Sequence, residues 1–233
     1  MKQIKLLLVE DDESFAFIVK GSLELIGNYN VYLAKNGYEG LKAYASFQPD
    51  VIVSDIEMPE MSGWEFIKSI RESDIRIPVI FASGRTNPRD VIDGYEIGVD
   101  NYIKKPYLVE ELNAHIRAIF KRLPVFSEVD EETKAKGLIP IGKYLLHVES
   151  RTLKIKGKEY VLTDMETKIL MVLYDHRGEL VKREELLAEV WGTNDFFSSR
   201  SLDVFVSKLR KYLEIDKSVK INTLRGEGLL LVV

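Results

Sequence analysis

Short apolar runs that end at acidic or polar residues constrain this chain more than any other feature. Val51–Val53 is such a run, and its β-branched side chains are typical of a strand buried on both faces of a parallel sheet. The run leads to Asp55, and Pro59 four residues later cannot continue the strand. Taken alone, such an aspartate is equally typical of a turn or a helix cap. At the carboxyl end of a central strand, however, it lies where open α/β sheets bind ligands.

Four further apolar runs alternate with segments of helical periodicity, and together they predict the first domain. Five strands and five helices in alternation indicate an α/β fold with a doubly wound five-stranded parallel sheet. The strands are expected at residues 5–9, 31–34, 51–53, 78–82 and 102–104, and the helices at 15–26, 37–47, 64–72, 90–97 and 109–121.

Chemically reactive side chains follow four of these strands: Glu10 and Asp11, Asp55, Ser83, and Lys105. Because the carboxyl ends of parallel strands meet at one edge of the sheet, we expect these side chains to converge. The acids at residues 10–13 could also be a solvated surface run, but carboxylates at such an edge predict a Mg²⁺ site. With the ion present, the Asp55 carboxylate could attack a phosphoryl group and form an acyl phosphate. The Lys105 ammonium would neutralise its charge, and the Ser83 hydroxyl would hydrogen-bond one of its oxygens.

The C-terminal part of the chain predicts a small antiparallel sheet, then helices, then a β-hairpin. The strands are expected at residues 144–148, 153–155 and 158–162, and the helices at 163–174, 183–190 and 199–213. Two helices, a third helix and a hairpin with its tip near Arg225 together indicate an α+β winged-helix domain. Such a domain binds double-stranded DNA by placing the third helix in the major groove.

The helix expected at residues 199–213 has an apolar stripe opposite a basic face. A basic face is usually only solvated, but on the third helix of this arrangement it predicts contact with DNA. The residues of that face are Arg200, Val204, Ser207, Lys208 and Lys211, and Arg225 would reach the DNA from the hairpin tip. The charge distribution agrees, because residues 138–233 carry 16 Lys/Arg against 14 Asp/Glu, whereas residues 1–124 carry 15 against 19.

Both halves carry motifs of one family. Residues 4–122 resemble the receiver domain of bacterial response regulators, and residues 139–233 resemble the winged-helix effector of the OmpR/PhoB family. The matching motifs are Glu10-Asp11, Asp55, Ser83, Tyr102 and Lys105-Pro106 in the first half, and Val190–Gly192, Ser201–Val204 and Arg225–Gly228 in the second. The resemblance implies a flavodoxin-like receiver domain at residues 1–123, a linker at 124–137 and a DNA-binding domain at 138–233.

The resemblance also implies a mechanism. Asp55 would accept a phosphoryl group from a sensor histidine kinase, Tyr102 would be a rotating aromatic of the switch, and the Glu57 backbone carbonyl would join the Mg²⁺ ligands. The Lys105-Pro106 bond would be cis. The protein would be a transcription regulator and no enzyme, acting on DNA as a homodimer and contacting RNA polymerase.

The chain departs from the family pattern at several positions. Lys182 stands where a capping hydroxyl is common, and Leu229 replaces an aromatic residue of the wing. Asn101 and His115 stand where an acid and an arginine would form ion pairs across a dimer interface, so that interface is expected to depend less on salt.

Two other functions compete with this interpretation. A Mg²⁺-dependent phosphohydrolase could use Asp55 as its nucleophile, but no insertion large enough for a substrate cap is present. A regulator could also keep its receiver only for dimerisation, independently of phosphorylation. The chain has no cysteine and no apolar run of the ~18 residues that span a bilayer, so we expect a cytoplasmic protein without membrane contact.

Overall fold

A computed structural model describes residues 3–84, 87–120, 137–192 and 196–233, and gives their side chains except for Pro88 and residues 196–200. The chain forms two compact units, residues 1–119 and 120–233. The linker expected at residues 124–137 lies outside the described residues except for Gly137, which has a positive φ of 62°. None of the described helices combines the length and apolar character needed to cross a membrane.

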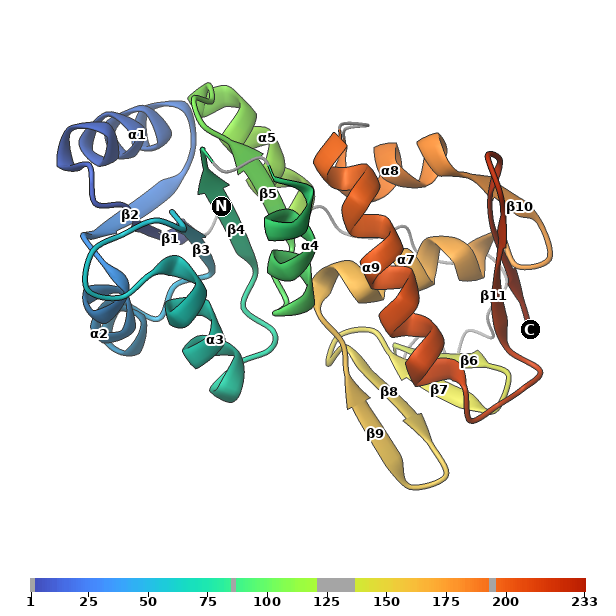
Figure 1. Ribbon diagram of the computed structural model, residues 1–233. Helices are drawn as coiled ribbons and strands as arrows, with labels where there is room; N and C mark the ends of the chain where they lie inside the picture. Colours follow the sequence, from blue (N-terminus) through green and yellow to red (C-terminus); the bar gives the residue numbers. More distant parts are fainter. Residues whose placement is uncertain (1–2, 85–86, 121–136, 193–195) are drawn as a thin grey trace. The chain divides into compact units, whose positions relative to one another are not determined.

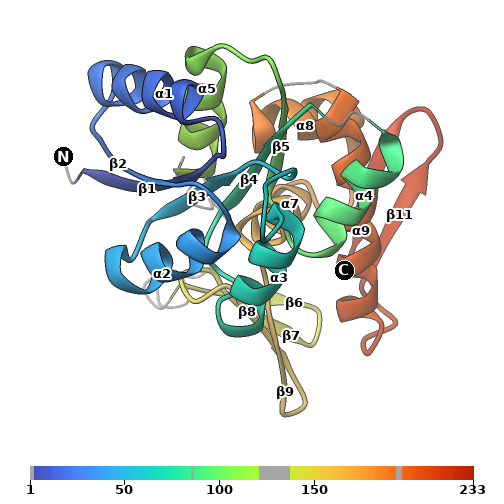
Figure 2. The same ribbon diagram turned by 60° about the vertical axis from the view of Figure 1, so that its left-hand side comes forward.

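The first unit is a five-stranded parallel sheet covered by helices on both faces, which confirms the predicted fold class (Figure 1). Its strands are β1 (Ile4–Val9), β2 (Tyr29–Ala34), β3 (Val51–Ser54), β4 (Val79–Ser83) and β5 (Asn101–Lys104). Its helices are α1 (Glu13–Ile26), α2 (Gly37–Phe47), α3 (Gly63–Ser73), α4 (Pro88–Glu96) and α5 (Val109–Phe120). Figure 2 shows α1 and α5 on one side of the sheet and α2 and α3 on the other.

The strand order β2-β1-β3-β4-β5 determines where the first unit can hold a ligand. The chain adds β2 on one side of β1 and then crosses to add β3, β4 and β5 on the other side. The connections after β1 and β3 therefore leave the sheet in opposite directions, and a crevice forms at the carboxyl ends of these two strands. Residues 6–9 and 51–54 are at most 1% exposed, so the strands that carry the crevice are also the centre of the core.

The second unit begins with a four-stranded antiparallel sheet and continues with three helices and a three-stranded sheet. The first sheet contains β6 (Leu138–Ile141), β7 (Tyr144–His147), β8 (Thr152–Ile155) and β9 (Lys158–Val161). The helices are α7 (Asp164–Asp175), α8 (Arg183–Trp191) and α9 (Phe196–Leu213). The second sheet contains β10 (Leu180–Lys182), β12 (Gly228–Val232) and β11 (Lys220–Leu224), in that order.

Helix α9 packs as its periodicity predicts. Its apolar stripe is at most 3% exposed and comprises Leu202, Phe205, Val206, Leu209 and Leu213. The helix begins at Phe196, three residues before the expected start. Strand β10 was absent from the sequence-based prediction, because its three residues are too few to show an alternating pattern.

Candidate functional site

Asp55 lies directly after β3 and is 8% exposed. The backbone N–H groups of Ile56 and Glu57 donate to its Oδ1 atom, at 2.5 and 3.2 Å. These two bonds orient the carboxylate, so that its Oδ2 atom faces the crevice side occupied by Lys105.

Lys105 connects two carboxylates that come from different strands. Its Nζ atom lies 2.5 Å from Oε2 of Glu10 and 2.5 Å from Oδ2 of Asp55. The Glu10 carboxylate follows β1 and is only 3% exposed, so burial raises its pKa above the ordinary value, and the Lys105 ammonium offsets this only in part. Burial alone would lower the pKa of Lys105, but its hydrogen bonds to Asp55 and Glu10 raise it instead. The ammonium therefore carries its charge throughout the neutral range.

An acidic cluster forms at the same place, as the sequence predicts. Glu10, Asp11 and Asp55 each offer a carboxylate oxygen, and the three oxygens lie within 4.8 Å of one another. Three hard oxygen donors around one point fit a divalent cation such as Mg²⁺, and because Asp11 is exposed, an ion held there would remain accessible to water. Asp12 has a different task, because its Oδ1 atom accepts the N–H of Phe15 at 3.0 Å and caps α1.

The two switch residues implied by the family resemblance, Ser83 and Tyr102, are both buried. Ser83 is 1% exposed at the end of β4, and its backbone carbonyl accepts the N–H of Lys105 at 2.9 Å. Tyr102 is 1% exposed on β5, with its ring edge-on to that of Phe81 at 6.3 Å. The Lys105-Pro106 bond is cis. Asn101 and His115, which were expected at a dimer interface, are both buried and are joined by a hydrogen bond of 2.6 Å between Nδ2 and Nδ1.

Gly63 is part of the site although the sequence did not single it out. Its N–H donates to the carbonyl of Ile56 at 2.9 Å, and a Cβ atom there would collide with the backbone carbonyl oxygen of Asp55. Only glycine allows the start of α3 to approach the reactive loop this closely. The available signal was its position after Ser62, which begins a capping box with Glu65.

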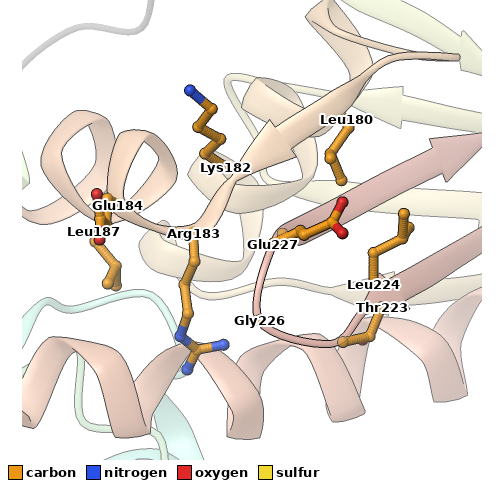
Figure 3. A pocket seen from close by; sticks show the side chains of 10 residues that line it. Leu180, Lys182, Arg183, Glu184, Leu187, Thr223, Leu224, Gly226 and Glu227 are labelled. Carbon is orange, nitrogen blue, oxygen red and sulfur yellow. The ribbon is translucent and has the colours of Figure 1, made fainter.

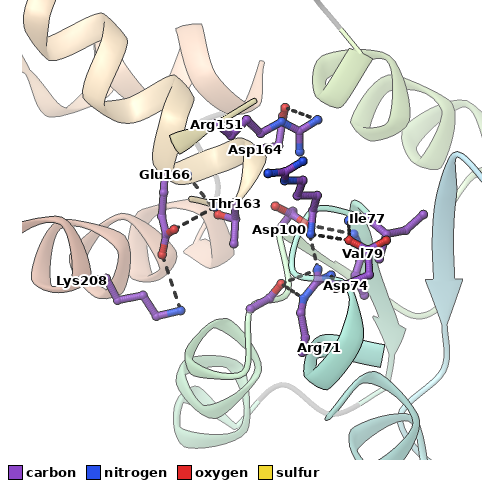
Figure 4. Close-up of polar contacts among 12 residues, drawn as sticks. Arg71, Asp74, Ile77, Val79, Asp100, Arg151, Thr163, Asp164, Glu166 and Lys208 are labelled. Atoms are coloured by element: carbon purple, nitrogen blue, oxygen red, sulfur yellow. Dashed lines mark hydrogen bonds and ion pairs between the residues drawn. The ribbon is translucent and has the colours of Figure 1, made fainter. Parts of the chain in front are cut away.

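In the second unit, the exposed face of α9 includes Ser207 and Lys211, while Val204 is half-buried. The side chain of Arg200 lies outside the described residues. Lys208 is only partly exposed, and its Nζ atom lies 3.9 Å from Oε1 of the buried Glu166 on α7 (Figure 4). The Lys208 charge is thus neutralised within the domain. This makes Lys208 a weaker candidate for contact with DNA than Lys211.

An open groove of about 560 Å³ lies between the hairpin β11–β12 and the start of α8 (Figure 3). Lys182 and Arg183 leave the start of α8 in opposite directions, and Glu227 lies on the facing hairpin. Nη1 of Arg183 forms an ion pair of 2.8 Å with Asp203 on α9. Arg225 at the hairpin tip is exposed. The groove is thus lined by the basic Lys182 and Arg183 and by the acidic Glu184 and Glu227.

Arg210 joins the helix to the hairpin and was not predicted to do so. Its Nε atom donates to the carbonyl of Ile221 at 2.9 Å, and its Nη2 atom donates to Thr223 Oγ1 at 2.7 Å. These bonds cross from α9 to β11, so the side chain holds the helix and the hairpin in a fixed relation. Helical periodicity could not reveal this role, because the partner strand lies more than ten residues further along the chain.

Comparisons with known proteins agree with both units. The family described as "Response regulator receiver domain" matches residues 6–117, and "Transcriptional regulatory protein, C terminal" matches residues 157–231. The transcriptional regulatory protein RprY of Bacteroides fragilis is 32% identical over 99% of this chain and 95% of its own length. The alkaline phosphatase synthesis transcriptional regulatory protein PhoP of Bacillus subtilis is 32% identical over 96% and 95%. The structure of DrrB, an OmpR/PhoB homologue of Thermotoga maritima, is similar with a TM-score of 0.51 and 27% identity over the whole of both chains.

Proposed function

Because the chain belongs to the OmpR/PhoB response regulators, which are phosphorylation-regulated transcription factors, we propose that Asp55 is its phosphoacceptor. The observation that supports this most strongly is the position of Lys105, whose ammonium contacts the carboxylates of Asp55 and Glu10 at 2.5 Å each. An ammonium that already neutralises two carboxylates is placed to neutralise an incoming phosphoryl group. The phosphoryl donor is a sensor histidine kinase, the partner class that the family implies.

The transfer forms one bond and breaks another. A carboxylate oxygen of Asp55 attacks phosphorus while the bond between phosphorus and the kinase histidine nitrogen breaks, and the nitrogen keeps the electron pair. The N–H groups of Ile56 and Glu57 hold Asp55 Oδ1 during the attack. Glu10, Asp11, Asp55 and the backbone carbonyl of Glu57 would hold Mg²⁺, which supplies positive charge to the phosphoryl oxygens.

The added phosphoryl group is the switch. It brings a charge of about −1.5 to −2 to the sheet edge. The Ser83 hydroxyl moves toward a phosphoryl oxygen, Tyr102 turns with it, and the altered surface favours a homodimer that binds two DNA half-sites. We propose that the receiver comprises residues 1–123, that residues 138–233 bind DNA, and that the dimer recruits RNA polymerase in the cytoplasm. Asn101 and His115, paired with each other, leave that dimer less dependent on exposed ion pairs.

Turnover of small phosphoesters is the competing enzymatic function, and a simple assay separates the two. After incubation with acetyl phosphate and Mg²⁺, a regulator gives a stable adduct of one phosphoryl group in the intact mass. A phosphohydrolase gives continuous release of inorganic phosphate without a persistent adduct. Absence of both the adduct and phosphate release would contradict the assignment of Asp55.

We predict that Mg²⁺ stabilises the protein through Asp11. An ion that binds only the folded state adds about 1.4 kcal/mol at a concentration tenfold above its Kd, and Asp11→Ala should remove most of this increment. Melting temperatures of the full chain with and without Mg²⁺ measure the effect. Asp12→Ala is the matched control, because loss of the α1 cap costs about 1 kcal/mol with or without the ion and leaves the increment intact. An increment lost in Asp12→Ala but kept in Asp11→Ala would refute the ligand assignment.

The DNA face predicted from the sequence comprises Arg200, Val204, Ser207, Lys208, Lys211 and Arg225, and the pairing of Lys208 with Glu166 makes Lys208 the weakest member of this set. We predict that Arg225→Ala weakens DNA binding through lost phosphate contact. Each phosphate contact contributes close to one unit to the slope of log affinity against log salt, so the slope should become shallower by about one. Titrations of a DNA duplex at several salt concentrations measure it, with Lys158→Ala on the four-stranded sheet as control. An Arg225→Ala protein with unchanged affinity and slope would exclude the hairpin tip from the interface.

A further inference from the structure

Strand β2 has one backbone side that faces away from the receiver sheet. It is the outermost strand in the order β2-β1-β3-β4-β5. The N–H groups of Ile4 and Glu10 donate to the carbonyls of Asn28 and Ala34, at 2.8 and 2.9 Å, so the even-numbered residues of this segment bond to β1. Because the backbone groups of successive strand residues alternate in direction, those of the odd-numbered residues 29–35 face outward.

The residues of β2 favour pairing with a further strand. Tyr29–Ala34 has the sequence YNVYLA, which is rich in aromatic and β-branched residues and contains no charged residue, proline or glycine. Edge strands usually carry charged residues or proline, which prevent pairing with another chain. An uncharged segment of this kind without them is typical of strands that pair with copies of themselves. Protection of this edge must therefore come from outside the strand.

Two side chains of α1 occupy the outward backbone groups at the centre of β2. Oε1 of Glu24 accepts the N–H of Val31 at 3.1 Å, and Nζ of Lys20 donates to the carbonyl of Val31 at 2.9 Å. The two side chains are one helical turn apart and form an ion pair of 3.8 Å. An ion pair that is about one-third exposed contributes little to stability by itself. Its position over Val31 matters more, because both groups that this residue would offer to another strand are already bonded.

Side chains also occupy outward groups on either side of Val31. Nε2 of Gln3 donates to the carbonyl of Tyr29 at 3.0 Å, and Oε2 of Glu39 accepts the N–H of Lys35 at 3.1 Å. Bonded groups at residues 29, 31 and 35 leave no two successive outward-facing residues open. A strand ladder requires successive residues, so an added strand has no place to begin.

We propose that the Lys20–Glu24 pair closes the β2 edge against pairing with a second copy of the chain. With the edge open, β2 of one copy would pair antiparallel with β2 of the other about a two-fold axis and join the two sheets. With the edge closed, association of two receivers is confined to other surfaces. The inference does not depend on phosphorylation of Asp55, so its failure would leave the proposed function untouched.

The test is the double variant Lys20→Met with Glu24→Ala, which keeps the formal net charge of −4. Sedimentation of the full chain at rising protein concentration, without a phosphoryl donor, should show a mass that approaches twice that of the wild type. The matched control is Lys35→Met with Glu13→Ala. This ion pair of 2.7 Å consists of the same residue types and is 62% and 71% exposed, so its loss should leave the sedimentation of the wild type unchanged.

A third substitution in the double variant, Asn30→Lys, identifies the surface that associates. The Asn30 side chain is exposed on β2, and a lysine there would place like charges close together in the paired strands. The triple variant should therefore sediment as the wild type does, a rescue that is not expected of a misfolded protein. A double variant that sediments like the wild type would overturn the proposal. A larger species that persists after Asn30→Lys would overturn it as well, because association would then occur through another surface.

Discussion

Replacing Asp55 by asparagine should abolish phosphoryl uptake and leave the fold intact. The amide has no nucleophilic carboxylate oxygen, so the acyl phosphate cannot form. Its carbonyl oxygen can still accept the N–H groups of Ile56 and Glu57, and Glu10 still pairs with Lys105, so little stability should be lost. Intact mass after treatment with acetyl phosphate and Mg²⁺ measures the uptake.

Asp50→Asn is the control for this experiment. Asp50 immediately precedes β3, and its Oδ2 atom accepts the backbone N–H of Lys5 at 2.9 Å, far along the strand from the crevice. The same chemical change there should leave phosphoryl uptake at the wild-type level. A phosphoryl adduct that forms equally in Asp55→Asn would show that another residue is the acceptor.

Replacing Gly63 by alanine should destabilise the protein more than the addition of a methyl group at any other glycine near the site. The new Cβ atom would collide with the carbonyl oxygen of Asp55 and lie 3.0 Å from Cα of Ile56. Backbone atoms cannot rotate away as a side chain can, so α3 or the reactive loop must shift, at a cost of about 1–3 kcal/mol or more. Because the loop carries Asp55, the rate of phosphoryl uptake should fall as well.

Gly21→Ala adds the same methyl group, but we expect it to raise the stability of the protein. Gly21 lies inside α1, and its Cβ atom would meet no atom within 4 Å. Alanine there should stabilise the protein by about 0.5–1 kcal/mol, because glycine in a helix interior loses more conformational entropy on folding. Urea denaturation of both variants compares the signs. A Gly63→Ala protein as stable as the wild type would mean that the approach of α3 to the loop is less close than in this structure.

The strands and their reactive ends could be predicted from the sequence because each signal is local. A β-branched run such as Val51–Val53 marks a buried strand, and the parallel arrangement then brings Glu10, Asp55 and Lys105 to one edge. The α9 stripe followed in the same way from helical periodicity. These local patterns were sufficient to predict the fold class and the residues of the acidic cluster.

The features that escaped prediction depend on contacts between residues distant in sequence. Gly63 matters because a backbone carbonyl eight residues earlier folds against it, and Arg210 because its partners are on β11. Lys208 seemed equivalent to Lys211 on the helical face, and only the position of Glu166 on α7 separates them.

The most direct test of the central claim is the affinity for DNA before and after phosphorylation. A duplex selected from a random pool by the full chain would be titrated with protein treated with acetyl phosphate and Mg²⁺, and with untreated protein. Phosphorylation of Asp55 should tighten binding of the wild type, while Asp55→Asn should bind with the same affinity under both conditions. Tightening that also occurs in Asp55→Asn, or a phosphorylated wild type that binds no better than the untreated protein, would contradict the account.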